Sequence, residues 1–138
     1  MSTERERSFG GVVVRGDEVL VITPAGRPQI ATLPKGGPQS GERPEATAAR
    51  EVREETGVEA RIVERLGEVR YRYRRDGVRV FKTVGFYLCD YVSGDTADHD
   101  HEVEQARWLP LEEARTGLTY PGEREMIERA LSKHTGSM

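Results

Sequence analysis

Residues 36–58 read GGPQSGERPEATAAREVREETGV, and this stretch decides how the rest of the chain is interpreted. Its first part is rich in Gly and Pro, which predicts an irregular loop from Pro34 to Arg43. Pro44 then opens a segment suited to a helix, because proline is well tolerated in the first helical turn. Gly57 is a stop signal, since glycine readily adopts the left-handed conformation that ends many helices. The stretch therefore predicts a loop followed by a helix over 45–56.

Three glutamates on this predicted helix share one face. Glu51, Glu54 and Glu55 are three and four residues apart, which places their Cβ atoms roughly 5–6 Å from one another. Like charges at this spacing destabilise a helix, and a bound cation would remove the conflict. Clustered carboxylates suit the hard ions Mg²⁺ and Mn²⁺. The helix alone also allows a second interpretation, a charged face exposed to water.

The spacing of the whole stretch resembles the Nudix box, and all nine specified positions of that motif match. The matching residues are Gly36, Glu42, Arg50, Glu51, Val52, Glu54, Glu55, Gly57 and Val58. The resemblance implies an α/β fold, an α/β/α sandwich around a mixed β-sheet, in which the box forms a loop-helix-loop catalytic motif. It also implies an enzyme that uses Mg²⁺ or Mn²⁺ to hydrolyse a nucleoside diphosphate linked to another moiety.

The same resemblance implies roles for individual residues. The Gly36 carbonyl and the carboxylates of Glu51, Glu54 and Glu55 are expected to hold the metal. Glu42 and Arg50 are expected to pair and support the loop and helix, so Arg50 joins Glu54 and Glu55 in the catalytic set. Members of the family take their general base either from a box glutamate or from a glutamate in a later loop.

Glu102 matches the later position, six residues before Trp108. It belongs to the run Asp98–Glu102, whose His and carboxylate side chains are also metal-ligand types. A solvated turn is the alternative interpretation of that run, from which we keep only Glu102 as a candidate catalytic residue.

Peripheral residues resemble the asymmetrical diadenosine tetraphosphate hydrolase branch, through the run 82–88 (KTVGFYL) and the spacing of Glu102 from Trp108. The resemblance implies that a dinucleoside polyphosphate or a (d)NTP is the substrate. The expected substrate-binding residues are Lys35, Tyr73, Lys82 and Phe86. Residues 37–40 (GPQS) depart from that branch, and 35–37 (KGG) is similar to the diphosphoinositol polyphosphate hydrolases. Hydrolysis of diphosphoinositol polyphosphates or ADP-ribose, or a catalytically silent binding module, therefore remain alternatives.

The rest of the chain is predicted to be mostly strands. Hairpins are expected over 10–23 and over 68–92, the second turning at Asp76-Gly77, the strongest hairpin signal in the sequence. Further short strands are expected at 30–33 and 103–109, and helices after Pro110 and Pro121. On the second hairpin Arg70, Arg72 and Arg74 alternate with apolar residues, which suggests either a basic face or an edge protected by charge.

Composition narrows the class of protein. The chain has 138 residues, and we expect 1–138 to form one Nudix hydrolase domain with flexible ends at about 1–7 and 135–138. With 36% hydrophobic and 33% charged residues, it has enough apolar material for a core. The net charge of −3 argues against a dedicated nucleic-acid binder.

The cysteine content and the absence of long apolar runs bear on where the protein is expected to be located. Its single cysteine fits a reducing compartment, because one thiol allows no internal disulfide. We find no apolar run near the roughly 18–20 residues that cross a bilayer, and no apolar signal segment near Met1. We therefore expect a cytoplasmic monomer or homodimer that acts on a nucleotide-type small molecule.

Overall fold

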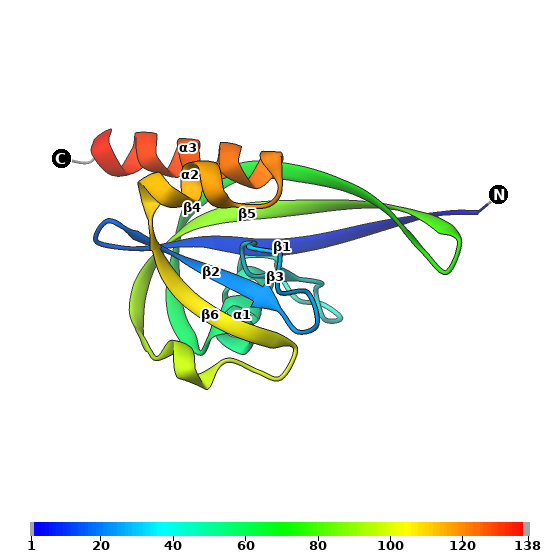
Figure 1. The fold of residues 1–138 in the computed structure, drawn as a ribbon, viewed down its shortest axis with the longest axis horizontal. Coiled ribbons are helices and arrows are strands. Elements are labelled where there is room, and N and C mark those ends of the chain that lie inside the picture. Colours follow the sequence, from blue (N-terminus) through cyan, green and yellow to red (C-terminus); the bar gives the residue numbers. More distant parts are fainter. Residues whose placement is uncertain (1, 137–138) are drawn as a thin grey trace.

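The computed structural model describes residues 2–136 and contains a six-stranded mixed sheet with helices on both faces (Figure 1). The strands are β1 Thr3–Arg15, β2 Glu18–Pro24, β3 Lys35–Gly36, β4 Val58–Arg75, β5 Val78–Gly94 and β6 Val103–Pro110. The helices are α1 Pro44–Thr56, α2 Leu111–Gly117 and α3 Pro121–Gly136, with a short 3-10 helix at Thr96–Asp98. The strand order is β4-β5-β1-β2-β6, and β3 pairs with β1. The expected α/β/α sandwich and mixed sheet are confirmed.

Alternate residues of the central strands build the two layers of the core. Val12 of β1 and Phe86 of β5 pack in the layer that includes α2 and α3. Val13 and Tyr87, one position along each strand, pack in the layer that includes Ala48 of α1. This alternation is what a period of two along a strand requires when both faces of a sheet are covered.

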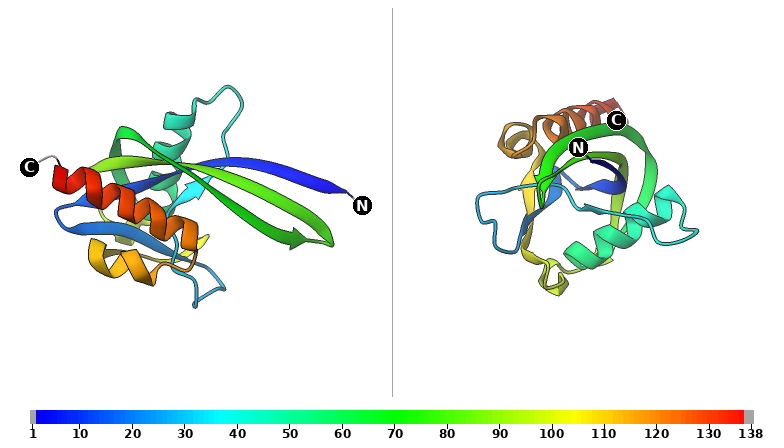
Figure 2. Two further views of the ribbon diagram at one scale, coloured as in Figure 1. Left: turned by 90° about the horizontal axis from the view of Figure 1, so that it is seen from above. Right: turned by 90° about the vertical axis from the view of Figure 1, so that its right-hand side faces the viewer.

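Part of the sheet projects from the body as an arm, formed by the β4–β5 hairpin and the first half of β1 (Figures 1 and 2). β1 runs parallel to β5 from Thr3↔Arg79 to Val14↔Asp90. We expected residues 1–7 to be flexible, but β1 begins at Thr3. We also expected 135–138 to be flexible; α3 includes residues 135 and 136, whereas 1 and 137–138 lie outside the described residues.

The segment 30–33 forms less regular structure than its sequence suggested. Only Thr32 pairs, in an isolated bridge to Ile22. The strand begins later, at β3, where Lys35 and Gly36 pair with Gly10 and Phe9 of β1. The expected strand at 30–33 is therefore wrong in position, because the prolines at 28 and 34 lack the backbone N–H groups that a longer ladder needs.

Helix α1 forms as its sequence predicts. Pro44 lies at its first position, and Gly57 ends it in the left-handed conformation, with φ of 78°. The Gly57 N–H donates to the Arg53 carbonyl at 2.8 Å. Glycine is required here, because a Cβ would fall 2.4 Å from the Asp95 carbonyl oxygen. Among the described residues, no helix is both long and apolar enough to cross a membrane.

Candidate active site

The Glu51 side chain lies against the backbone of β3. A Cβ built on Gly36 would fall 2.1 Å from Glu51 Oε2, so a glycine at this position makes room for the carboxylate. Burial raises the pKa of the Glu51 carboxyl; the Arg50 guanidinium opposes this shift and the Glu54 carboxylate adds to it. The Gly36 backbone and Glu51 are therefore brought together as the sequence predicted.

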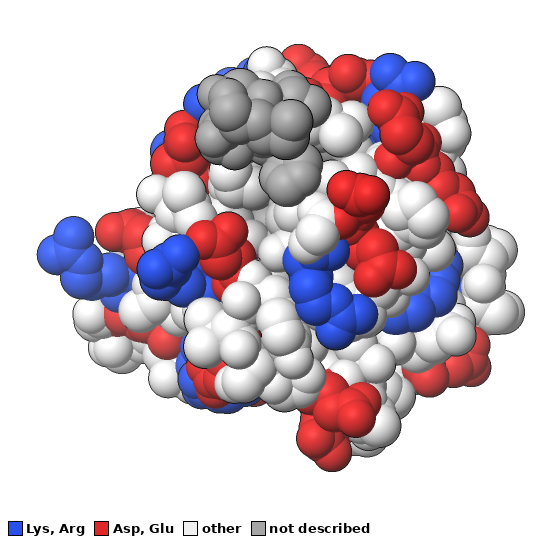
Figure 3. All heavy atoms as spheres, turned by 90° about the vertical axis from the view of Figure 1, so that its left-hand side faces the viewer, with Lys and Arg blue, Asp and Glu red and all other residues white. Residues whose placement is uncertain are grey.

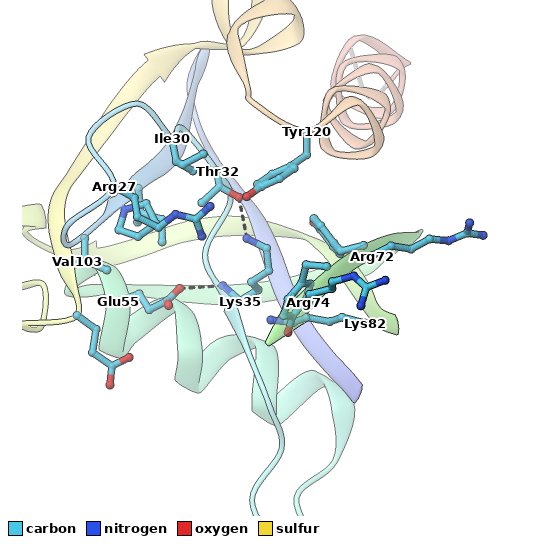
Figure 4. Close-up of a pocket in the computed structure, with 15 residues that line it drawn as sticks. Arg27, Ile30, Thr32, Lys35, Glu55, Arg72, Arg74, Lys82, Val103 and Tyr120 are labelled. Carbon is cyan, nitrogen blue, oxygen red and sulfur yellow. Dashed lines mark hydrogen bonds between the residues drawn. The ribbon is translucent and has the colours of Figure 1, made fainter. Parts of the chain in front are cut away.

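Glu55 is the most enclosed of the three glutamates. Its Oε1 accepts a hydrogen bond of 2.8 Å from the Lys35 backbone N–H, as the dashed line in Figure 4 shows. Burial raises the pKa of the Glu55 carboxyl to about 7, although the bond from Lys35 and the positive charge of Lys35 both lower it. Carboxylates of Glu51 and Asp100 raise it further. On balance, the surroundings of Glu55 therefore disfavour the negatively charged form of its carboxyl.

Arg50 clamps the loop to the helix. It donates to both oxygens of Glu42, at 2.8 and 2.9 Å, and to the Gly37 carbonyl at 2.9 Å. The pKa of Glu42 falls to about 2, first because of the bonds from Arg50 and then because of one from the Gln39 backbone. The same interaction with Glu42 raises the pKa of Arg50. The predicted pair of Glu42 and Arg50 is thus present. Two parallel hydrogen bonds also hold the guanidinium and the carboxylate in one relative orientation.

Glu54 is the exposed member of the set. Its side chain is 44% exposed, and its carboxylate accepts bonds from Arg50 at 3.0 and 3.2 Å. Among residues 2–136, no three His, Cys, Asp or Glu side chains are placed closely enough to hold an ion as they stand. The donor chemistry nevertheless fits a hard divalent cation, because Glu51, Glu54, Glu55 and the Gly36 carbonyl offer only oxygen ligands. A cation would also relieve the repulsion that raises the pKa values of Glu51 and Glu55.

A cavity of about 550 Å³ opens beside Glu55. Its charged lining residues are Arg27, Lys35, Glu55, Arg72, Arg74, Lys82 and Glu102. Arg27 and Ile30 come from the loop after β2, and Tyr120 from the segment before α3 (Figure 4). The cavity thus combines several positive charges with apolar walls, which suits an anionic ligand that has an apolar part.

Glu102 lies at the same cavity as Glu55, as its sequence position predicted. Both backbone polar groups of Glu102 are hydrogen-bonded: its N–H donates to Asp100 Oδ1 at 3.1 Å, and its carbonyl accepts from the Ala25 N–H at 3.0 Å. Asp100 in turn donates its N–H to the Glu54 carbonyl at 3.1 Å. The loop that carries Glu102 is therefore anchored to the end of α1.

Three of the four predicted substrate-binding residues line the cavity: Lys35, Tyr73 and Lys82. Burial lowers the pKa of Lys82, and the nearby charge of Lys35 lowers it further. The prediction for Phe86 is wrong, because its side chain is fully buried in the core layer below α3. Strand alternation points Phe86 toward that layer, so its ring is not available to stack on a base.

The Lys35 ammonium is occupied by protein groups. It donates to Thr32 Oγ1 and to the Leu33 carbonyl, each at 2.7 Å, and lies 3.2 Å from Glu123 Oε2. Glu123 is fully buried and also accepts from Thr32, from the Leu33 N–H and from the Tyr71 hydroxyl. Lys35 is therefore held within the wall of the cavity.

Sequence reasoning missed Glu123, although a signal was present. Glu123, Met126, Ile127 and Ala130 have the spacing of one helical face, and all four are buried. A charged residue on an apolar stripe is almost never fully buried unless it is paired. That position alone predicts a buried partner, which the structure identifies as Lys35.

Comparisons with known proteins agree with this architecture. A family model described as NUDIX domain matches residues 4–130. The chain is 38% identical over 139 aligned residues to a proposed mutator protein, MutT4, of Mycobacterium tuberculosis (strain CDC 1551 / Oshkosh), covering 94% of this chain and 56% of that protein. It is 35% identical over 102 residues to an 8-oxo-(d)GTP phosphatase of Mycolicibacterium smegmatis, covering 74% and 30%.

The chain therefore spans about half the length, or less, of these curated relatives. Among solved structures, an Ap4A hydrolase of C. elegans in a binary complex superposes with a TM-score of 0.76 at 24% identity. That superposition covers 95% of this chain and 98% of the other. At this identity the likeness concerns the fold.

Proposed function

The chain belongs to the NUDIX domain family, and from this premise we propose that it hydrolyses a diphosphate linkage in a nucleoside diphosphate linked to another moiety, with Mg²⁺ or Mn²⁺. One observation carries the proposal. Glu51, Glu54 and Glu55 lie on α1, where Glu51 lies against the Gly36 backbone and Glu55 lines a cavity of about 550 Å³ whose wall includes Lys82. Hard oxygen donors next to positive charge suit a metal ion and the phosphates that it contacts.

Each part of the site has a task in this reaction. The Gly36 carbonyl with Glu51, Glu54 and Glu55 would hold the metal, which when bound offsets charge on phosphate oxygens and lowers the pKa of a bound water. Arg50, fixed by Glu42, keeps the loop against the helix. Phosphoryl transfer depends mainly on positioning and electrostatic stabilisation, so a rigid frame around the carboxylates contributes directly to rate.

We assign the general base to Glu102. It lines the cavity together with Glu55, and its loop is held to α1 through Asp100. Glu102→Gln should slow kcat by about 10²-fold or more, the usual contribution of a proton-transfer group, and should change metal activation much less. Glu104→Gln, an exposed neighbour on β6, is the matched control. A Glu102→Gln enzyme within about threefold of the wild type would return the base to the box helix.

The substrate that fits best is a dinucleoside polyphosphate or a (d)NTP. Lys82 and Arg27 can meet phosphate oxygens, while Ile30 and Tyr120 offer apolar surface for a base. The names of two relatives, a proposed mutator protein and an 8-oxo-(d)GTP phosphatase, support a nucleotide substrate. The Ap4A hydrolase of C. elegans shares the fold.

Glu54→Gln tests the proposal as a whole. The wild type should release product from at least one nucleoside polyphosphate in Mg²⁺ or Mn²⁺ and stop in chelator. Glu54→Gln should lose about 10²-fold or more in kcat, because it removes a contributor to transition-state electrostatics. Glu45→Gln changes the same residue type in the first turn of the same helix and should keep wild-type activity. Near-normal turnover by Glu54→Gln would contradict the assigned site.

A further inference from the structure

A second hollow lies on the arm, beside the candidate active site. Its volume is about 320 Å³. It is lined by Arg72, Tyr73, Arg74, Arg79, Val80 and Phe81. Three of its six lining residues are arginines and none is acidic, whereas the lining of the first cavity includes two glutamates. The second hollow therefore has the larger fraction of basic residues.

The two cavities adjoin each other. Arg72, Tyr73 and Arg74 line both of them. Figure 4 shows the Arg72 side chain extending away from Glu55 and Lys35, outward along the arm. A ligand that occupies the first cavity and continues beyond these residues would therefore enter the second.

The arginines of the second hollow lack acidic partners. Among the described residues, no carboxylate oxygen lies within 4.0 Å of Arg72, Arg74 or Arg79. The acidic side chains of β1 on the arm, Glu4 and Glu6, both pair with Arg75 instead. Unpaired like charges around one hollow repel each other and attract an anion.

Charge elsewhere on the molecule is arranged differently. Figure 3 shows the end opposite to the arm, where acidic and basic side chains are interspersed. Protection of an exposed strand edge requires only scattered charges, and β4 is an edge strand of the sheet. Edge protection does not account for unpaired arginines gathered around a hollow that shares three lining residues with the cavity of the candidate active site.

The aromatic side chains of the hollow have separate tasks. Phe81 lies under two guanidinium groups, with Arg5 at 5.4 Å and Arg72 at 5.5 Å from its ring centroid. It therefore orients cations, as cation–π contacts do. Tyr73 is 38% exposed and adjoins both cavities, so its ring is accessible to a ligand that passes between them.

We propose that this hollow binds a second phosphate-bearing nucleotide group of an elongated substrate, the part beyond the diphosphate that is cleaved. The inference rests on the proposed function and narrows it to substrates whose far end is anionic. Arginines that meet phosphates beside an accessible aromatic ring are the usual chemistry of contact with nucleotide chains. Such a group could come from a dinucleoside polyphosphate or from the end of an RNA strand.

Arg79→Ala is the decisive variant, because Arg79 lines the second hollow and not the first. KM should rise about fivefold for diadenosine tetraphosphate, as expected for loss of one exposed charge contact, and by less than about twofold for ATP. Arg70→Ala is the matched control, since Arg70 is exposed on β4 and lines neither cavity. It should leave the KM for both substrates within about twofold, which separates local contact from general electrostatic attraction.

A triphosphorylated RNA oligonucleotide, assayed beside diadenosine tetraphosphate, identifies the source of the second group. Whichever of the two loses affinity in Arg79→Ala relative to Arg70→Ala is the class that the hollow accepts. Equal effects of both variants on both compounds would overturn the inference while leaving hydrolysis intact. If the wild type cleaves none of these compounds, its substrate is another member of the proposed class, and equilibrium binding of the same compounds in chelator decides the inference by the same comparison.

Discussion

Glu55 carries a pH dependence that can be measured without substrate. Its pKa is raised to about 7 in the folded protein, chiefly by burial, from an ordinary value of 4.5. The folded state then binds more protons than the unfolded state between these values, so metal-free protein should lose stability as pH rises from about 4.5 to 7. The loss should be on the order of 2–3 kcal/mol.

Urea unfolding at pH 5 and pH 8 in chelator checks this prediction for wild type and Glu55→Gln. The amide can still accept the Lys35 N–H, so the difference in stability between the two pH values should be smaller in Glu55→Gln than in the wild type by about 2–3 kcal/mol. Glu113→Gln, on the exposed side of α2, should keep the wild-type difference. An unchanged difference in Glu55→Gln would assign the pH dependence to other groups.

Side-chain roles were predictable where they belong to the Nudix box. The resemblance to the box implied that Glu42 and Arg50 pair, and the structure contains this pair. The role of Phe86 depended instead on which layer a strand residue faces, and sequence alone gave an accessible ring where the structure has a buried one. The alternation of side chains along a strand shows which residues share a face of the sheet, but it does not show which face is covered by helices.

At the scale of elements, the contact between β3 and α1 yields a sharp test. Gly36→Ala would place a methyl group 2.1 Å from the Glu51 carboxylate, which must then move. We expect Mn²⁺ affinity to fall by about tenfold or more, as when groups that orient metal ligands are lost. Titration calorimetry with Mn²⁺ measures this without turnover.

Gly37→Ala is the matched control, because its Cβ would find only the Arg7 carbonyl, at 4.0 Å. This variant adds the same methyl group one residue away and should bind Mn²⁺ as the wild type does. Equal affinities for Gly36→Ala and Gly37→Ala would show that Glu51 is not a ligand held by this contact.

Among the elements, those with strong local signals were predicted best. The Asp76-Gly77 turn and the helix opened by Pro44 appear where the sequence placed them. The first half of β1 was not predicted, since its alternating Glu and Arg residues have the composition of a solvated end. It forms a strand because it pairs with β5 and because Glu6 pairs with Arg75 on β4. The composition of residues 3–9 alone does not predict the pairing with β5 or the ion pair with Arg75.

At the scale of the whole molecule, Glu123 joins α3 to the wall of the cavity. Glu123→Gln should lower the free energy of unfolding by about 3 kcal/mol, because it removes one partner of a buried pair and leaves the Lys35 ammonium uncompensated. Glu125→Gln, whose partner Arg129 is on the surface, should change it by less than about 0.5 kcal/mol. Urea unfolding compares the two, and similar losses would mean that the buried pair adds nothing to stability.

The parallel pairing of β1 with β5 also determines when the sheet can be completed. Thr3 pairs with Arg79, 76 residues later in the chain, and every pair in this ladder has the same separation. At ribosomal rates of about 5–20 residues per second, β1 leaves the ribosome roughly 4–15 s before its partner strand does. The β1–β2 hairpin can form in microseconds, so it waits with one hydrogen-bonding edge open. We therefore expect the charged residues at 4–7, alternately acidic and basic, to matter during synthesis as well, because charge on an unpaired strand opposes its pairing with another nascent chain.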